Sequence, residues 1–165
     1  MKVALYIGSH EKDTFIVRLG WAATRLVQKG EFANVTHVEA ILAEHEDGSV
    51  DIGSASIRDG GVRVKTTKLN PEHWIIVDVP KWSVLKARKW FAEHDGEKYD
   101  SRGAFASAFP IQWKQKNRWF CNESVGASVG MKSPEIFGPS QFAAAAMSFG
   151  CDVTEEFFKA RYASF

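Results

Sequence analysis

The sequence has little cysteine, and this shortage limits the chemistry that the chain can support. Cys121 and Cys151 are the only two thiols among 165 residues. A domain of this length does not need disulfides for stability. No Cys-x-x-Cys or His-x-x-x-His spacing occurs, so the paired ligands typical of zinc sites are missing. The sequence therefore predicts reduced cysteines, no metal site and a chemistry that requires no cofactor.

The chain also lacks an excess of one charge and any long apolar run. Its 21 Lys and Arg nearly balance its 20 Asp and Glu, which leaves a net charge of +1. This balance argues against nucleic acid as a partner, because such binding depends on clustered positive charge. The first apolar run is too short for a signal-peptide core, and no segment is long enough to span a membrane. We expect a cytoplasmic protein, or one that is phage-borne or released on lysis, of unknown oligomeric state.

The residue pattern predicts one α+β domain over residues 1–165. Segments that alternate apolar and polar residues indicate strands, and two Asp-Gly dipeptides between them indicate turns of an antiparallel meander. Apolar residues at helical spacing, with a capping residue before them or Gly after them, indicate helices that pack on the central sheet. The predicted strands are 2–8, 35–43, 50–57, 62–65 and 74–79, and the predicted helices are 13–29, 83–94, 101–109 and 141–146, with two more that start at Cys121 and Thr154.

One predicted helix begins at Cys121, directly after the aromatic pair Trp119 and Phe120. Val125 and Val129 follow at helical spacing, so the thiol lies at the edge of a buried helix face. At a helix N-terminus, unpaired N–H groups and the helix dipole favour a thiolate and can also donate to an oxyanion. This placement is typical of a nucleophile. The alternative is a structural cysteine, because free thiols are often buried for packing alone.

A thiolate nucleophile needs an imidazole within hydrogen-bond reach, and His37 is the best placed of the five histidines. It lies in the middle of a predicted strand, where alternation puts Glu39 on the same face. If Asp47-Gly48 is a two-residue turn, paired positions sum to 95 (47 plus 48), and Ser54 and Ser56 join this face. Each of these three polar side chains is a candidate for orienting the imidazole. The alternative is a strand histidine with a structural role.

Four motifs occur in an order that resembles a known family. They are THVEAIL, VDIGSAS with RDGGVR, EKYDSRGAF, and WFCNESVG. Together with the spacing of about eighty residues between His37 and Cys121, they resemble the circularly permuted, NlpC-like branch of the papain-fold cysteine hydrolases, in which histidine precedes cysteine. The resemblance covers nearly the whole chain, roughly from Lys2 to Phe149.

The resemblance implies a papain-like domain, with an antiparallel sheet or small barrel against which the cysteine-bearing helix packs. By this resemblance, Cys121 is the nucleophile and His37 is the general base and acid. The third catalytic residue falls on the next strand, where this sequence offers Ser54 in place of the Glu or other strongly polar group common in the family. Tyr99 matches a Tyr-Asp element whose tyrosine lies near the active site. Tyr99 is explained equally well as a core aromatic residue before a helix-capping Asp100.

Glu39, Ser56 and Trp119 are further candidates for contacts with the substrate. Glu39 and Ser56 share the predicted face of His37. Trp119 ends an aromatic and basic stretch, 109–119, that leads into the candidate nucleophile. That stretch is either one wall of a cleft or a solvated loop with two packed tryptophans.

The function predicted from these residues is hydrolysis of an amide or ester through an acyl-thioester, without a cofactor. The substrate is a peptide or acyl compound, with the peptides of peptidoglycan as one option. Two alternatives remain. A catalytically silent papain-like binding module would keep the groove and have an unreactive thiol. An acyltransferase similar to lecithin:retinol acyltransferase would take its acyl group from a lipid and need an apolar, elongated groove.

Overall fold

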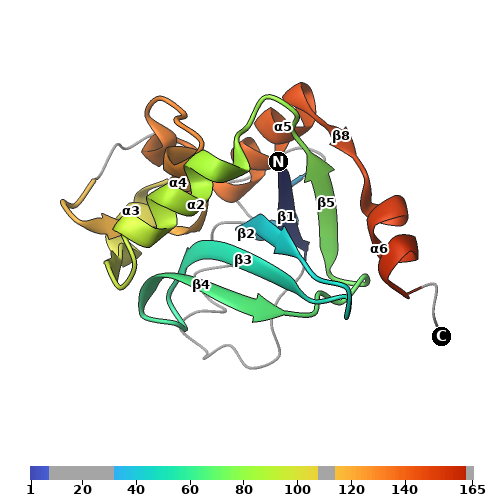
Figure 1. Ribbon diagram of the computed structural model, residues 1–165. Helices are drawn as coiled ribbons and strands as arrows, with labels where there is room; N and C mark the ends of the chain where they lie inside the picture. Colours follow the sequence, from blue (N-terminus) through green and yellow to red (C-terminus); the bar gives the residue numbers. More distant parts are fainter. Residues whose placement is uncertain (8–31, 108–113, 163–165) are drawn as a thin grey trace.

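The computed structural model describes residues 1–7, 32–107 and 114–162, and these form an α+β structure around one curled sheet. Eight strands lie in the order β7-β6-β4-β3-β2-β1-β5-β8, and the sheet curls into a half-barrel (Figure 1). Neighbouring strands are antiparallel, except that β6 and β7 are parallel. The predicted antiparallel sheet is confirmed. The strands are β1 (Lys2–Ile7), β2 (Val35–Glu44), β3 (Val50–Ser56), β4 (Gly61–Thr67), β5 (Trp74–Asp78), β6 (Lys98–Tyr99), β7 (Arg118–Trp119) and β8 (Cys151–Asp152).

Helices pack on both faces of the sheet. Phe91 on α2, Val125 on α4 and Phe142 on α5 are fully buried in one apolar cluster with residues of the sheet. Phe157 and Phe158 on α6 belong to a second cluster with other sheet residues. Figure 1 shows α2, α4 and α5 together on one side of the strands and α6 beside β5. The helices are α2 (Val84–Glu93), α3 (Ser101–Ala106), α4 (Cys121–Ser128), the short 3-10 helix η1 (Pro134–Ile136), α5 (Pro139–Phe149) and α6 (Thr154–Tyr162).

The helix boundaries follow the capping residues in the sequence. Ser83 precedes α2, and its hydroxyl accepts a hydrogen bond from the N–H of Lys86. Asp100 precedes α3, and its carboxylate accepts one from the N–H of Gly103. The predicted strands and helices in the described ranges are confirmed to within a few residues. The predicted helix 13–29 and the end of the predicted helix 101–109 lie outside the described residues.

The start of α5 corrects one prediction. The helix begins at Pro139, after the N-cap Gly138, and not at 141 after Ser140. Proline suits the first helical turn, because the N–H that it lacks would have no partner there.

The pairing of β2 with β3 corrects a second prediction. Ala40 pairs with Gly53, so paired positions here sum to 93 and not to 95. The connecting loop is longer than a two-residue turn, because the N–H of His45 donates to the carbonyl of Ser49 at 2.9 Å and leaves three residues between them. A register irregularity also interrupts β2. Since the register differs by an even number of positions, the side chains keep their predicted faces.

β2 and β3 separate beyond Gly53, and the start of α4 lies against the opening. The hydroxyl of Ser54 donates to the carbonyl of Val38 at 2.7 Å. The N–H of Ala55 donates to the hydroxyl of Ser124 on α4 at 2.9 Å, and this hydroxyl donates at 2.7 Å to the carbonyl of the first residue of α4. Two serine hydroxyls therefore replace hydrogen bonds of the β-ladder and fix α4 against β3.

Replacing Ser124 by Ala is expected to lower the free energy of unfolding by about 1–3 kcal/mol, because the buried N–H of Ala55 loses its acceptor. Chemical denaturation measures the loss. Ser128→Ala is the matched control, since Ser128 is also buried on α4 but its hydroxyl only donates to the carbonyl of Val125 in the same helix. Equal losses in the two variants would contradict the bridging role of Ser124.

Candidate active site

Cys121 is the first residue of α4, as predicted. The chain enters the helix from extended backbone at Phe120 (φ −113°, ψ 172°). The Cys121 side chain is buried, with 2% of the residue exposed, and its sulfur lies 3.7 Å from Oδ1 of Asn122. Nδ2 of Asn122 donates to the carbonyl of Phe137 at 2.6 Å, which fixes this amide. The thiol therefore lies at the helix end whose first N–H groups have no helical partner.

His37 lies on β2, opposite Tyr6 of β1. Its Nε2 is 2.8 Å from Oε1 of Glu39, which follows two residues later on the same face. Cys121 also lies close enough to the imidazole to raise the pKa of His37. The two residues predicted as nucleophile and base thus lie near each other, although 84 positions separate them in the sequence.

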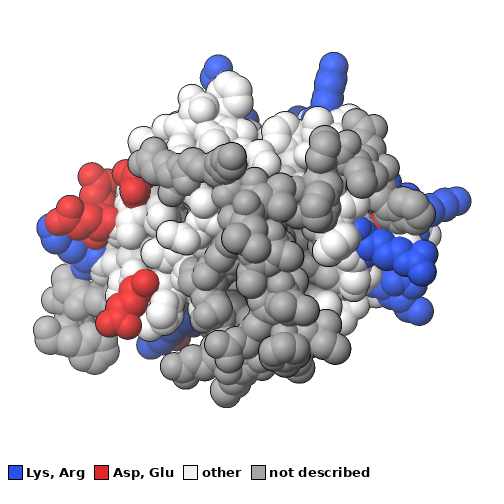
Figure 2. Space-filling model, turned by 180° about the vertical axis from the view of Figure 1, so that it is seen from behind, with Lys and Arg blue, Asp and Glu red and all other residues white. Residues whose placement is uncertain are grey.

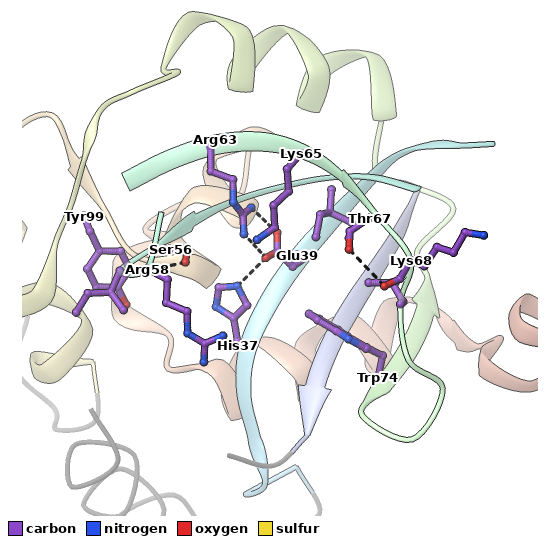
Figure 3. A pocket seen from close by; sticks show the side chains of 13 residues that line it. His37, Glu39, Ser56, Arg58, Arg63, Lys65, Thr67, Lys68, Trp74 and Tyr99 are labelled. Atoms are coloured by element: carbon purple, nitrogen blue, oxygen red, sulfur yellow. Dashed lines mark hydrogen bonds and ion pairs between the residues drawn. The ribbon is translucent and has the colours of Figure 1, made fainter. Parts of the chain in front are cut away.

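Arg63 on β4 holds the carboxylate of Glu39 in place. Its Nη1 is 2.7 Å from Oε2 of Glu39, and its Nη2 is 2.5 Å from Oε1 (Figure 3). Nε of Arg63 donates to Asp59 at 2.6 Å. Sequence reasoning missed Arg63. It pairs with Ser54 across β3 and β4, so alternation along two successive strand pairs places it on the face of Glu39.

Burial and neighbouring charges move the pKa values of this network. Burial alone would lower the pKa of His37, but the charge of Glu39 and the contact with Cys121 outweigh it and raise the pKa from 6.5 to about 9. Burial would raise the pKa of Glu39, but hydrogen bonds from Arg63 and the charge of His37 lower it from 4.5 to about 2. At neutral pH, His37 is therefore cationic and Glu39 anionic.

The hydroxyl of Ser54 donates to a backbone carbonyl and not to the imidazole of His37. Its hydroxyl is buried and donates to the carbonyl of Val38, where it completes the separated part of the β-ladder. Glu39, a candidate both for orienting the imidazole and for contacting the substrate, hydrogen-bonds Nε2 of His37. Ser56 lines the pocket beside His37, and its hydroxyl accepts a hydrogen bond from the N–H of Arg58 at 3.3 Å.

Tyr99 and Trp119, the two aromatic candidates, lie in different surroundings. Tyr99 lines the pocket, and burial followed by the charge of Cys121 raises its pKa well above the ordinary value, which places it near the thiol. Trp119 packs edge-to-face on Trp90, with ring centroids 4.9 Å apart, and its indole N–H donates to Glu97. Trp119 is therefore a packed tryptophan, and it is not among the described residues that line this pocket.

Glu123 is a buried carboxylate two residues after the thiol, and sequence reasoning gave it no role. Its Oε2 accepts a hydrogen bond from the N–H of Phe120 at 3.3 Å. Its Oε1 has no hydrogen-bond partner and lies 3.6 Å from Nζ of Lys114. Burial raises the pKa of Glu123 from 4.5 to about 7, more than the charge of Lys114 lowers it. A Glu at the third position of a helix is typical of a capping box. This pattern in the sequence could have identified Glu123 as a residue that caps the start of α4.

A pocket of about 160 Å³ lies on the face of the sheet that carries His37 (Figure 3). His37, Glu39, Ser56 and Tyr99 line it. The predicted site residues on β2, β3 and β6 therefore share one cavity, with the exception of Ser54.

Comparisons with protein-family models, with curated proteins and with solved structures found no match for this chain. The likeness to NlpC-like hydrolases therefore stays a prediction from the motifs.

Within the described ranges, none of the helices is long and apolar enough to cross a membrane. The same residues contain no group of three or more His, Cys, Asp or Glu that could hold a metal ion. In the view from behind (Figure 2), acidic atoms lie mainly on the left, and basic atoms lie beside them, at the top and on the right, so this face carries both signs of charge.

The free energy of unfolding is expected to fall as the pH rises from about 6.5 to about 9. The pKa of His37 is higher in the folded state than in the unfolded state. The contribution of His37 to the free energy of unfolding is therefore fully present below pH 6.5 and is lost as the pH rises through about 9. The loss is on the order of 3 kcal/mol. Denaturation at a series of pH values measures it. Glu39→Gln removes the charge that raises the pKa of His37 and should flatten this decline. The control Glu46→Gln, at an exposed position, should leave the decline unchanged. If stability falls as steeply with pH in Glu39→Gln as in the wild type, the ion pair between His37 and Glu39 is contradicted.

Glu123→Gln is expected to make the protein more stable above pH 7. The raised pKa of Glu123 means that the folded state holds a proton that the unfolded state releases, so wild-type stability declines between about pH 4.5 and 7. The glutamine removes this decline and gains about 1–3 kcal/mol above pH 7. Denaturation at pH 5 and pH 8 compares the two proteins, with Glu135→Gln as the control. A variant that is less stable than wild type at pH 8 would show that the charged carboxylate is required.

Proposed function

We propose that the protein is a thiol hydrolase that cleaves an amide or ester with Cys121 as the nucleophile. One observation carries the proposal: the imidazole of His37 hydrogen-bonds the carboxylate of Glu39 and lies close enough to Cys121 for this residue to raise its pKa. A nucleophile, a base and a group that orients the base are the three parts that activated nucleophiles require.

The reaction follows from these contacts. In the reacting form, the proton of the Cys121 thiol is already on His37, and the deprotonated Cys121 sulfur attacks the substrate carbonyl, so that a C–S bond forms. N–H groups at the start of α4 donate to the oxyanion. His37 then gives its proton to the leaving amine or alcohol as the C–N or C–O bond breaks. A water molecule, deprotonated by His37, attacks the thioester, and the acid product and the free thiol are released.

We assign the third catalytic role to Glu39 and not to Ser54. A carboxylate with a pKa of about 2 keeps its charge throughout the neutral range and stabilises the imidazolium. Arg63 supports this role, because two hydrogen bonds from its guanidinium prevent the carboxylate from rotating. This constellation also supports the proposed papain-like fold, with the cysteine helix packed on an antiparallel sheet.

The pocket beside His37 measures about 160 Å³, and four Lys and Arg side chains line it. These charges suit a polar substrate better than the lipid that the acyltransferase alternative requires. Peptides, including those of a cell wall, remain the proposed substrates, and the cytoplasm, or release by a phage or on lysis, remains the proposed setting.

Alkylation of the two cysteines tests the proposal within one sample. Cys151 is exposed and serves as the internal reference for an ordinary thiol. With iodoacetamide near pH 6.5, Cys121 is expected to react about tenfold or more faster than Cys151, because the proposed mechanism makes Cys121 the activated nucleophile. Peptide mass spectrometry gives both rates. His37→Gln should slow Cys121 by a similar factor and leave Cys151 unchanged.

The result that would overturn catalysis is a Cys121 rate that follows the pH profile of Cys151 and ignores His37→Gln. That outcome would favour the silent binding module. In the enzyme, loss of the general base is expected to reduce hydrolysis of a reactive ester such as 4-nitrophenyl acetate by about 10²–10⁴-fold.

A further inference from the structure

Arg63, which binds the carboxylate of Glu39, is itself held by Asp59 in the turn between β3 and β4. The two Nη groups of Arg63 donate to Glu39, and its Nε donates to Oδ2 of Asp59 at 2.6 Å. Nζ of Lys65 lies 3.2 Å from the same oxygen of Asp59. Figure 3 shows Glu39 between Arg63 and His37. Asp59 is not among the described residues that line the pocket, so it acts on the site only from behind Arg63.

The bond to Asp59 completes the restraint on the guanidinium of Arg63. The N–H donors of a guanidinium lie in one plane, and two of its nitrogens already bind one carboxylate. A bond from Nε to a second carboxylate fixes the rotation of this plane. The side chain of Arg63 is 12% exposed, so water replaces this bond poorly. The orientation of Glu39, and through it that of His37, therefore depends on Asp59.

The charges along this chain of contacts alternate in sign. Asp59 is negative, Arg63 positive, Glu39 negative and His37 positive at neutral pH. Without the charge of Asp59, the positive charge of Arg63 would be less well balanced and would oppose the cationic form of His37. Loss of Asp59 would thus act on His37 in the same direction through charge as through orientation.

The turn that carries Asp59 is fixed in place by β6. The N–H of Tyr99 donates to the carbonyl of Gly60 at 3.2 Å. A Cβ on Gly61 would lie 1.9 Å from the carbonyl oxygen of Glu97, so the close approach of β4 to this segment requires glycine. Asp59 therefore holds Arg63 from a rigid part of the backbone.

We propose that Asp59 is a positioning residue for the catalytic base, on which it acts through Arg63 and Glu39. The proposal rests on the thiol hydrolase function. The contacts of Asp59 in the described part of the chain are with Arg63 and Lys65, and not with His37 or Cys121. Its loss therefore slows the chemical step and leaves substrate binding nearly unchanged. The Asp-Gly dipeptide at Asp59 thus does more than form the turn that the sequence predicts.

Asp59→Asn tests the proposal, because it removes the charge and keeps the shape of the side chain. An Asn-Gly dipeptide forms the same turns as Asp-Gly, so the variant keeps the local fold. Asp51→Asn is the matched control. Asp51 lies on β3, its side chain is 30% exposed like that of Asp59, and it accepts a hydrogen bond from Thr66 at 2.6 Å. It is not among the described residues that line the pocket.

Two measurements distinguish positioning from a general loss of stability. NMR titration of the His37 ring is expected to give a lower pKa in Asp59→Asn than in the wild type, and an unchanged pKa in Asp51→Asn. Hydrolysis of 4-nitrophenyl acetate, an uncharged ester, is expected to show a kcat that is about tenfold lower in Asp59→Asn. KM should stay nearly constant. Asp59→Glu keeps the charge and should recover part of the lost kcat.

The proposal is overturned if Asp59→Asn keeps the kcat of the wild type or its His37 titration. Equal losses in Asp51→Asn would overturn it as well, because the effect would then be one of charge alone. Failure of the hydrolase function is distinguishable, because the His37 titration needs no turnover. A lower pKa of His37 in Asp59→Asn, together with a wild type that hydrolyses no ester, would leave Asp59 assigned to the orientation of His37 and reject catalysis.

Discussion

The ion pair between His37 and Glu39 is the interaction on which the site depends. Both side chains are largely buried, and charges in that environment are tolerated only when they are paired and hydrogen-bonded. Arg63 supplies the second partner of Glu39, and Asp59 supplies that of Arg63. Each charge in this chain of contacts is fixed by the next one, so the imidazole is held in one orientation. The thiol of Cys121 completes the chain at its other end.

The separation of β2 from β3 makes this contact geometrically possible. A fully paired sheet would leave no access for a helix end to a side chain in the middle of β2. Beyond Gly53 the two strands part, and Ser54 and Ser124 take over the hydrogen bonds that the ladder loses. Because Ser124 lies one turn into α4, the hydroxyl that accepts the N–H of Ala55 also donates to the carbonyl of Cys121 and so holds the residue that carries the thiol. Ser54 thus has a structural task that explains why its hydroxyl does not orient His37.

Local patterns in the sequence predicted the elements and the two reacting groups. Alternation placed His37 and Glu39 on one face, and the apolar spacing after Cys121 placed the thiol at a helix start. The cap at Asp100 was predicted from residue type alone. Each of these features depends on residues within a few positions of one another, which is why periodicity and capping rules reach them.

Features that depend on distant pairing could not be predicted in the same way. The predicted β2–β3 register was wrong because three residues connect His45 and Ser49 and because a register irregularity interrupts β2, and a two-residue turn rule anticipates neither. Arg63 was missed because its contact with Glu39 requires two correct registers in succession. The burial of Glu123 was missed because a helix start rich in polar residues suggests solvent exposure, whereas here it packs into the protein. The choice between Ser54 and Glu39 as the third group needed coordinates for the same reason.

The most direct test of the central claim is the protonation state of His37, measured by ¹⁵N NMR of its ring at pH 8. This pH lies above the ordinary histidine pKa of 6.5 and below the value of about 9 that its surroundings impose. The account predicts an imidazolium with both ring nitrogens protonated in the wild-type protein, and a fall in its pKa when Glu39 is replaced by Gln. A neutral ring at pH 8 that titrates near 6.5 in both proteins would contradict the account, because His37 would then be independent of Glu39 and Cys121.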